Sequence, residues 1–223
     1  MGEYPHLGQV DSDGGRLFST IYSRLTPVYI SVENQMTPLS SLFETVIFWV
    51  ILLGVFVTDG IFVRRHEGFK EKGKRKKELF SPLVLLAWLA AAILIGYVGI
   101  GALPDWLFYP GEILFVVGYA FQIYSITLLG RYYSTLVEVQ PNHKVIESGP
   151  YRFIRHPNYL GQMVGAVGLG MALQSWVSLL VLLVIGGGFF AYRIRNEEAF
   201  LVAEIGGYAD YMKRTKRLVP FIF

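Results

Sequence analysis

Long apolar runs alternate with short charged segments along the chain. The apolar runs cover residues 42–63, 82–103, 111–129 and 159–192. A helix needs about 20 residues, at a rise of 1.5 Å each, to cross the hydrocarbon core of a bilayer. Several of the runs reach that length, so a single anchor does not explain them. The pattern predicts an all-α integral membrane protein.

The last run, residues 159–192, is too long for one untilted span. One long helix would place the basic C-terminal tail on the opposite side of the membrane from the other basic segments, against the positive-inside rule. Two short helices that turn near Gln174 and Ser175 remove this conflict. We therefore predict five transmembrane helices, the last two forming a tight hairpin, with the N-terminus outside and the C-terminus in the cytoplasm.

Charge and composition agree with this layout. The mean hydropathy is +0.43 and 53% of the residues are hydrophobic, unlike the composition of a typical soluble domain. The basic loop at residues 64–79 is predicted to be cytoplasmic. The sequence thus divides into a polar tail at 1–41, three transmembrane helices at 42–129 and a C-terminal core at 130–223.

Several kinds of chemistry are excluded or disfavoured. The chain contains no cysteine, which excludes disulfides, thiolate nucleophiles and cysteine-ligated metals. Its four histidines show no metal-ligand spacing, so no metal is expected. A nucleic-acid partner is not expected either; membrane lipids are the expected surroundings.

The stretch GPYRFIRHPNYLG, residues 149–161, places unusual polarity at the start of an apolar run. Proline is favoured at the first position of a helix, so Pro157 is predicted to begin one, with His156 near its N-cap. The free N–H groups of the helix start, together with Arg155 and His156, form a candidate anion site. The alternative is that Arg152 and Arg155 simply reach lipid phosphates.

A second polar segment, RIRNEE, follows the other arm of the hairpin. It contains Arg193, Arg195, Glu197 and Glu198. Carboxylates at a membrane boundary are costly unless they meet a cation. If the hairpin forms, these residues return beside Pro157, and the two segments face one cytoplasmic pocket. Such a pocket suits a small zwitterionic or cationic ligand.

The order HKVIESGPYRFIRHPNYLG, apolar hairpin, RIRNEE and GGYADYMKRTKRLVPFIF resembles the isoprenylcysteine carboxyl methyltransferase family and, more distantly, the phospholipid methyltransferases. The resemblance covers residues 130–223. It implies an enzyme that takes S-adenosylmethionine from the cytosol and a lipophilic acceptor from the bilayer, with the acceptor group most simply the carboxylate of a prenylated cysteine or a similar lipid.

The resemblance also implies which residues form the cofactor-binding region on the cytoplasmic side. The implied cofactor-binding residues are His143, Val145, Gly149, Tyr151, Arg155, His156, Pro157, Tyr159, Glu197 and Glu198. Arg193 or Arg195 is implied to lie near the acceptor, and with Glu197 and Glu198 forms the candidate catalytic set; the spacing leaves the choice between the two arginines open.

Other functions remain open at this stage. A membrane reductase of the sterol type, which uses NADPH, carries a similar RHPNY stretch. A phospholipid or thiol methyltransferase and a non-catalytic membrane protein are further alternatives. The sequence determines neither the methyl acceptor nor the oligomeric state.

Overall fold

The computed structural model describes residues 41–67, 74–75, 82–134, 138–139 and 142–218. The predicted N-terminal tail lies outside this part of the chain except for Ser41, and so does most of the basic loop. All described residues belong to one unit, Thr37–Phe223.

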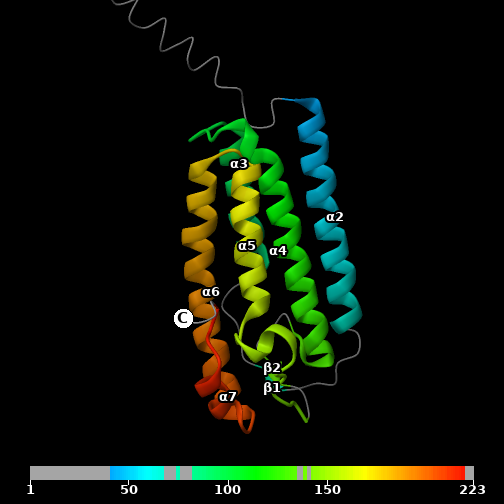
Figure 1. Ribbon diagram of the computed structural model, residues 1–223, viewed down its shortest axis with the longest axis vertical. Coiled ribbons are helices and arrows are strands. Elements are labelled where there is room, and N and C mark those ends of the chain that lie inside the picture. The colour runs from blue at the N-terminus through cyan, green and yellow to red at the C-terminus, as the bar shows by residue number, and fades with distance from the viewer. Residues whose placement is uncertain (1–40, 68–73, 76–81, 135–137, 140–141, 219–223) are drawn as a thin grey trace, which may run out of the picture. The chain divides into compact units, whose positions relative to one another are not determined.

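Helices dominate this unit, which confirms the predicted all-α class. Five long helices run side by side and a short one follows (Figure 1): α2 (Leu42–Glu67), α3 (Pro82–Tyr97), α4 (Phe108–Leu129), α5 (Pro157–Ala172), α6 (Trp176–Glu204) and α7 (Tyr208–Arg214). Short 3₁₀ turns occur at Asp105–Leu107, Gly130–Tyr132 and Gly149–Arg152. A two-residue strand in the basic loop, β1 (Lys74–Arg75), pairs antiparallel with β2 (Glu138–Val139), so that Lys74 lies opposite Val139.

The predicted hairpin turn is confirmed. Helix α5 ends at Ala172 and α6 begins at Trp176. Gln174 takes a positive φ of 51°, and the Ser175 hydroxyl accepts a hydrogen bond from the Ser178 amide. Serine at this position satisfies one of the free N–H groups of the helix start.

Two helix ends differ most from the predicted spans, while α2 runs four residues past its predicted end and α4 begins three residues early. Helix α3 stops at Tyr97, short of residue 103, because Gly99 and Gly101 then adopt positive φ and turn the chain. Its exit is held to the hairpin turn by a bond from the Leu103 amide to the Gln174 carbonyl, 2.7 Å. Helix α6 continues past residue 192 to Glu204, so the RIRNEE segment is helical.

Three helices are long and apolar enough to cross a membrane, judged by length and composition among the residues that the structure describes. They cover Leu42–Phe62, Asp105–Tyr132 and Trp176–Glu204. Helices α3 and α5 have 16 residues each, fewer than the roughly 20 that a 30 Å hydrocarbon core requires. The main apolar core lies between α2, α3, α4, α5 and α6 and includes Phe48, Phe108, Leu173 and Leu182.

Glycines bring the backbones of α4 and α5 into direct contact. A Cβ added at Gly118 would lie 2.4 Å from the Gly165 amide nitrogen, and one at Gly168 would lie 2.3 Å from the Phe115 amide nitrogen. Small residues allow this close approach of membrane helices. The glycines of α5 thus pack mainly against α4, whereas in α6 an added Cβ at Gly187 would meet nothing within 4 Å.

Gly168→Ala is therefore expected to lower the thermal unfolding midpoint in detergent. The added methyl group has no room, and overpacking of this kind costs about 1–3 kcal/mol. Gly187→Ala is the matched control and should keep or raise the midpoint, because alanine is the better helix former. Equal midpoints for the two variants would contradict the close α4–α5 packing.

Candidate functional site

The polar chemistry gathers where α5 begins, α6 ends and the C-terminal segment passes between them. Pro157 is the first residue of α5 and His156 is its N-cap, as the sequence predicts. The Arg155 and His156 amides donate to the carbonyls of Lys216 and Arg217, at 2.8 and 3.0 Å. The segment after α7 therefore lies along the residues that precede α5.

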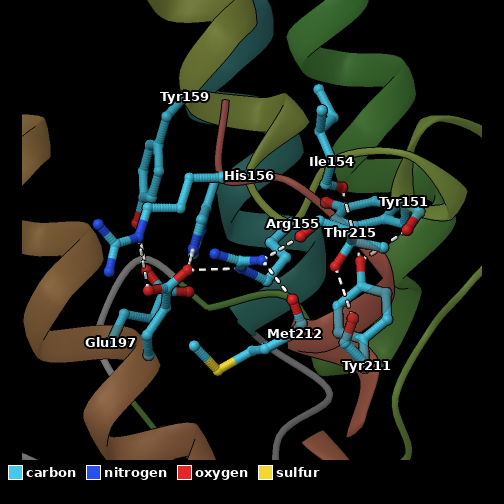
Figure 2. Close-up of polar contacts among 11 residues, drawn as sticks. Tyr151, Ile154, Arg155, His156, Tyr159, Glu197, Tyr211, Met212 and Thr215 are labelled. Atoms are coloured by element: carbon cyan, nitrogen blue, oxygen red, sulfur yellow. Dashed lines mark hydrogen bonds and ion pairs between the residues drawn. The ribbon is translucent and has the colours of Figure 1, made fainter. Parts of the chain in front are cut away.

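Glu198 joins these three parts of the chain. Its Oε1 accepts from Arg155 Nε at 2.6 Å and lies 3.3 Å from His156 Nε2, and its Oε2 accepts from Arg217 Nε at 3.0 Å. The residue is only 3% exposed. Arg155 also donates to the carbonyls of Met212 and Thr215 (Figure 2). The candidate anion-binding groups at the helix start are thus engaged by a carboxylate of the chain itself.

Glu197, the other member of the acid pair, is placed differently. Its Oε2 accepts a hydrogen bond from the Tyr159 hydroxyl at 2.6 Å, and that hydroxyl accepts one from Arg193 Nε at 2.7 Å (Figure 2). No described residue is hydrogen-bonded to its Oε1. Glu197 lines a pocket that Glu198 does not line. The two adjacent carboxylates therefore have different environments, one turned to a pocket and one buried among cations.

This pocket, called the donor pocket below, is open to solvent and contains a cavity of about 100 Å³. Its walls come from the end of α4, the loop 143–146, the start of α5, the end of α6 and α7. The lining residues are Leu129, Tyr132, Tyr133, Ser134, His143, Lys144, Val145, Ile146, Tyr151, Arg155, His156, Asn158, Tyr159, Glu197, Leu201, Ile205, Tyr208 and Tyr211.

His143 contributes a buried acceptor or donor to this pocket. Its Nδ1 has no hydrogen-bond partner among the described residues, and its ring stacks on Tyr132 with centroids 4.4 Å apart. Burial and the neighbouring positive charge of Arg131 lower the pKa of His143 below its ordinary value of 6.5. The imidazole is therefore neutral at physiological pH and has an unused nitrogen.

Tyrosines form much of the remaining wall. Burial raises the pKa of Tyr151, Tyr208 and Tyr211, and the nearby Glu197 carboxylate adds to the rise for the first two. Their hydroxyls therefore stay protonated. The Tyr211 hydroxyl donates to the Tyr151 carbonyl at 2.7 Å, which ties α7 to the residues before α5. Neutral aromatic faces attract cations.

Most of the predicted residues meet in the donor pocket. His143, Val145, Tyr151, Arg155, His156, Tyr159 and Glu197 line it. Gly149 does not, and it instead supplies a positive φ of 56° beside Leu128. Pro157, which begins α5, does not line the pocket, and neither does Glu198, which pairs with Arg155 and Arg217. Arg193 reaches the Tyr159 hydroxyl, whereas Arg195 is exposed.

Sequence reasoning missed several lining residues. Asn158 stands inside the predicted motif, and Tyr208 and Tyr211 belong to the GGYADY segment, but no individual role was predicted for any of them. Tyr132 and Tyr133 follow α4 and carried no motif signal. The end of α4 and the loop at 143–146 meet only in the folded protein, where the Tyr132 ring stacks on His143.

Comparisons with known proteins show what the chain is similar to. The model of the isoprenylcysteine carboxyl methyltransferase family matches residues 112–203. A protein-S-isoprenylcysteine O-methyltransferase of Schizosaccharomyces pombe is 28% identical over 160 residues, which are 63% of this chain and 66% of that protein. Protein-S-isoprenylcysteine O-methyltransferase A of Arabidopsis thaliana is 32% identical over 120 residues, 52% of this chain and 61% of that protein.

The resemblance predicted from the sequence is confirmed. The match begins before residue 130, because it includes most of α4, and it ends at residue 203. The chain spans less than two thirds of the length of these two relatives. Given this match and its long apolar helices, the chain is an integral membrane protein, as its composition predicts.

A solved structure supports the fold. The structure of a eukaryotic intramembrane Ras methyltransferase of this family aligns with a TM-score of 0.55 and 22% identity, covering 65% of this chain and 55% of that one. The common feature is the arrangement of the helices.

Glu198→Gln is expected to destabilise the protein and to expose its C-terminal segment. The change leaves the Arg155 guanidinium, whose side chain is 8% exposed, without a counter-charge. Breaking one partner of a buried pair costs about 3–5 kcal/mol. Thermal unfolding and limited proteolysis after α7 measure the effect. Asp210→Asn, which removes the exposed pair with Lys213, should leave both unchanged, and equal behaviour of the two variants would contradict the role of Glu198.

Proposed function

We propose that this protein is a membrane methyltransferase that transfers the methyl group of S-adenosylmethionine to a lipophilic acceptor from the bilayer, most simply the carboxylate of a prenylated cysteine or a similar lipid. The observation that carries the proposal is the donor pocket, which Glu197 lines together with several tyrosines and where no described residue is hydrogen-bonded to Glu197 Oε1. Most of this pocket lies within the segment that the family model matches.

The residues present fit such a donor. An α-ammonium group needs an acceptor, and Glu197 Oε1 is available for it. A nucleoside needs hydrogen-bonding partners, and the unused His143 Nδ1 is one. Lys144, an exposed lining residue with no ion pair among the described residues, would meet the ligand carboxylate. This assignment replaces the expected carboxylate site at Arg155 and His156, since both of those side chains contact Glu198.

Each residue of the pocket has a positioning role in this proposal. When bound, S-adenosylmethionine supplies an electrophilic methyl group on a sulfonium. The aromatic rings of Tyr151 and Tyr208, which line the pocket, would stabilise positive charge there. The Tyr159 hydroxyl holds Glu197 in place through its 2.6 Å bond. Most of the catalysis then comes from holding the reacting atoms in line.

Arg193 is the better candidate than Arg195 for the acceptor. It contacts Tyr159 at the edge of the donor pocket, whereas Arg195 is exposed. A guanidinium at this place would orient a carboxylate acceptor. In the transfer, a carboxylate oxygen forms a bond to the methyl carbon while the carbon–sulfur bond breaks, and the electron pair stays on sulfur. A carboxylate acceptor is already ionised, so this step needs no general base.

Ligand titration by calorimetry in detergent tests the donor assignment. S-adenosylhomocysteine is expected to bind with micromolar affinity, and Glu197→Gln should weaken binding about 10- to 100-fold, the value of one hydrogen bond to a charged group. Asp105→Asn removes an exposed carboxylate that does not line the donor pocket. This variant should bind S-adenosylhomocysteine as the unchanged protein does. Binding of NADPH without S-adenosylhomocysteine would favour the sterol-type reductase and overturn the proposal.

We also propose that all five long helices cross the membrane and that the donor pocket faces the cytoplasm. The basic loop at 64–79 and the basic C-terminal segment support this orientation. The α5–α6 turn lies at the opposite end of the bundle from α7 (Figure 1). In this arrangement residues 42–129 form a membrane-spanning part and residues 130–223 the catalytic core, with 1–41 as an external tail.

The absence of cysteine makes this topology directly testable. A single cysteine replaces Asp105 in one variant and Lys213 in another, and intact cells are treated with a membrane-impermeant maleimide. Both positions are exposed. The proposal expects labelling at 105 in intact cells and labelling at 213 only after lysis. The reverse pattern, or labelling of both in intact cells, would contradict it.

A further inference from the structure

The cavity of the donor pocket is small for the ligand proposed to bind there. It measures about 100 Å³, whereas sites for small organic ligands enclose roughly 300–1,000 Å³. The pocket can therefore enclose S-adenosylmethionine only if part of its wall moves outward. The walls from α4, α5 and α6 belong to long packed helices, so the candidates for movement are α7 and the loop that begins at His143.

Helix α7 is anchored to the residues that precede α5. The Tyr211 hydroxyl donates to the Tyr151 carbonyl at 2.7 Å. The carbonyls of Met212 and Thr215 accept hydrogen bonds from the Arg155 guanidinium. These contacts fix α7 in place, which leaves the loop as the wall that is free to move.

Residues 143–148, called the lid below, form this wall. Four of them line the pocket. Among the described residues, none is hydrogen-bonded to the backbone of the first five residues of the lid. The residues on either side of the lid both take positive φ, 58° at Asn142 and 56° at Gly149. A segment with few backbone hydrogen bonds opens at a low free-energy cost.

Side chains hold the lid against the rest of the pocket at three points. The His143 ring stacks on Tyr132, with centroids 4.4 Å apart. Val145 packs against the buried tyrosines of α7. Glu147 forms an ion pair with Arg214, the last residue of α7. The first two contacts lie in the pocket wall itself, whereas neither member of the ion pair lines the pocket.

The ion pair has the geometry of a clasp between the lid and α7. Arg214 Nη1 donates to Glu147 Oε2 at 3.0 Å, and Nη2 donates to Oε1 at 3.1 Å. Two parallel hydrogen bonds of this kind fix the orientation of both groups. The side chains are 61% and 43% exposed, so the pair is weak and is screened by salt. A contact of this strength can hold the lid closed and still release it.

We propose that the lid opens to admit the donor and that Arg214 is a positioning residue, which holds the closed lid through Glu147. This inference rests on the proposed binding of S-adenosylmethionine and adds how that site is closed. Opening is a change of conformation in which no covalent bond forms or breaks. The closed lid keeps His143 and Lys144 in the pocket wall, where they hold the donor for transfer.

The dissociation rate of S-adenosylhomocysteine tests the clasp. Purified full-length protein in detergent is loaded with labelled ligand and chased with unlabelled ligand by rapid mixing. Arg214→Gln and Glu147→Gln should each raise the dissociation rate about two- to fivefold, the range of an exposed ion pair. The double variant should release the ligand no faster than either single variant, because both changes remove one contact. An unchanged rate in the single variants would overturn the inference.

Two controls separate the clasp from a general loss of charge or stability. Lys213→Gln removes the neighbouring cation of α7, which pairs with Asp210, and should keep the dissociation rate of the unchanged protein. Arg214→Lys keeps the charge and should release the ligand more slowly than Arg214→Gln. The thermal unfolding midpoint without ligand should stay the same in all of these variants. A lower midpoint in Arg214→Gln with an unchanged dissociation rate would show a purely structural pair.

A covalent link tests the movement of the lid directly, since the chain has no cysteine of its own. The variant that combines Glu147→Cys with Arg214→Cys is loaded with S-adenosylhomocysteine and treated with a short bismaleimide. The linked protein should release the ligand more slowly than the same variant without the reagent. Equal release rates would contradict an opening lid.

The outcomes also separate this inference from the proposed function. If the protein binds S-adenosylhomocysteine and neither the variants nor the link alters its release, the methyltransferase proposal stands and the lid fails. If no S-adenosylhomocysteine binds to the unchanged protein, the methyltransferase proposal fails and the lid fails with it.

Discussion

The buried carboxylate of Glu198 is the interaction on which the site depends. It joins Arg155 and the N-cap His156 at the start of α5 to Arg217 of the C-terminal segment, so two separate parts of the chain converge on one side chain of α6. A buried charge is tolerated only with such compensation. Because Glu198 fixes the α6 register at this point, the preceding residue of the helix, Glu197, is directed to the donor pocket, where its contact with Tyr159 holds it. The structural and the ligand-facing carboxylates are thus adjacent in sequence.

The second constraint is the contact between α4 and α5, where glycines allow the two backbones to meet. This contact brings the end of α4, with Tyr132 and Tyr133, to the loop that contains His143. It also places Gln122 beside Gly161, near the start of α5. The packing of two apolar helices therefore determines where the end of α4 lies relative to the pocket wall at residues 143–146.

The sequence was sufficient for the helical class, the hairpin turn at Gln174 and Ser175, and the meeting of the two polar motifs, because the lengths of the apolar runs, the positions of the basic residues and the helix start at Pro157 can be read directly from it. It could not distinguish Glu197 from Glu198, since adjacent residues of a helix point about 100° apart and only the packed neighbours decide which one is buried. It also could not show that Arg155 and His156 are occupied by an internal carboxylate. The pocket residues after α4 were missed because their contacts with residues 143–146 depend on tertiary packing.

The central claim is that the donor pocket, between the loop at 143–146 and the end of α6, binds S-adenosylmethionine. An experimental structure of the full-length protein with S-adenosylhomocysteine tests this most directly. The account predicts ligand density in that pocket, with the ligand ammonium within hydrogen-bonding distance of Glu197 and the Glu198 contacts with Arg155 and Arg217 unchanged. Density for the ligand elsewhere on the protein, or an ammonium bound by Glu198 instead, would contradict it.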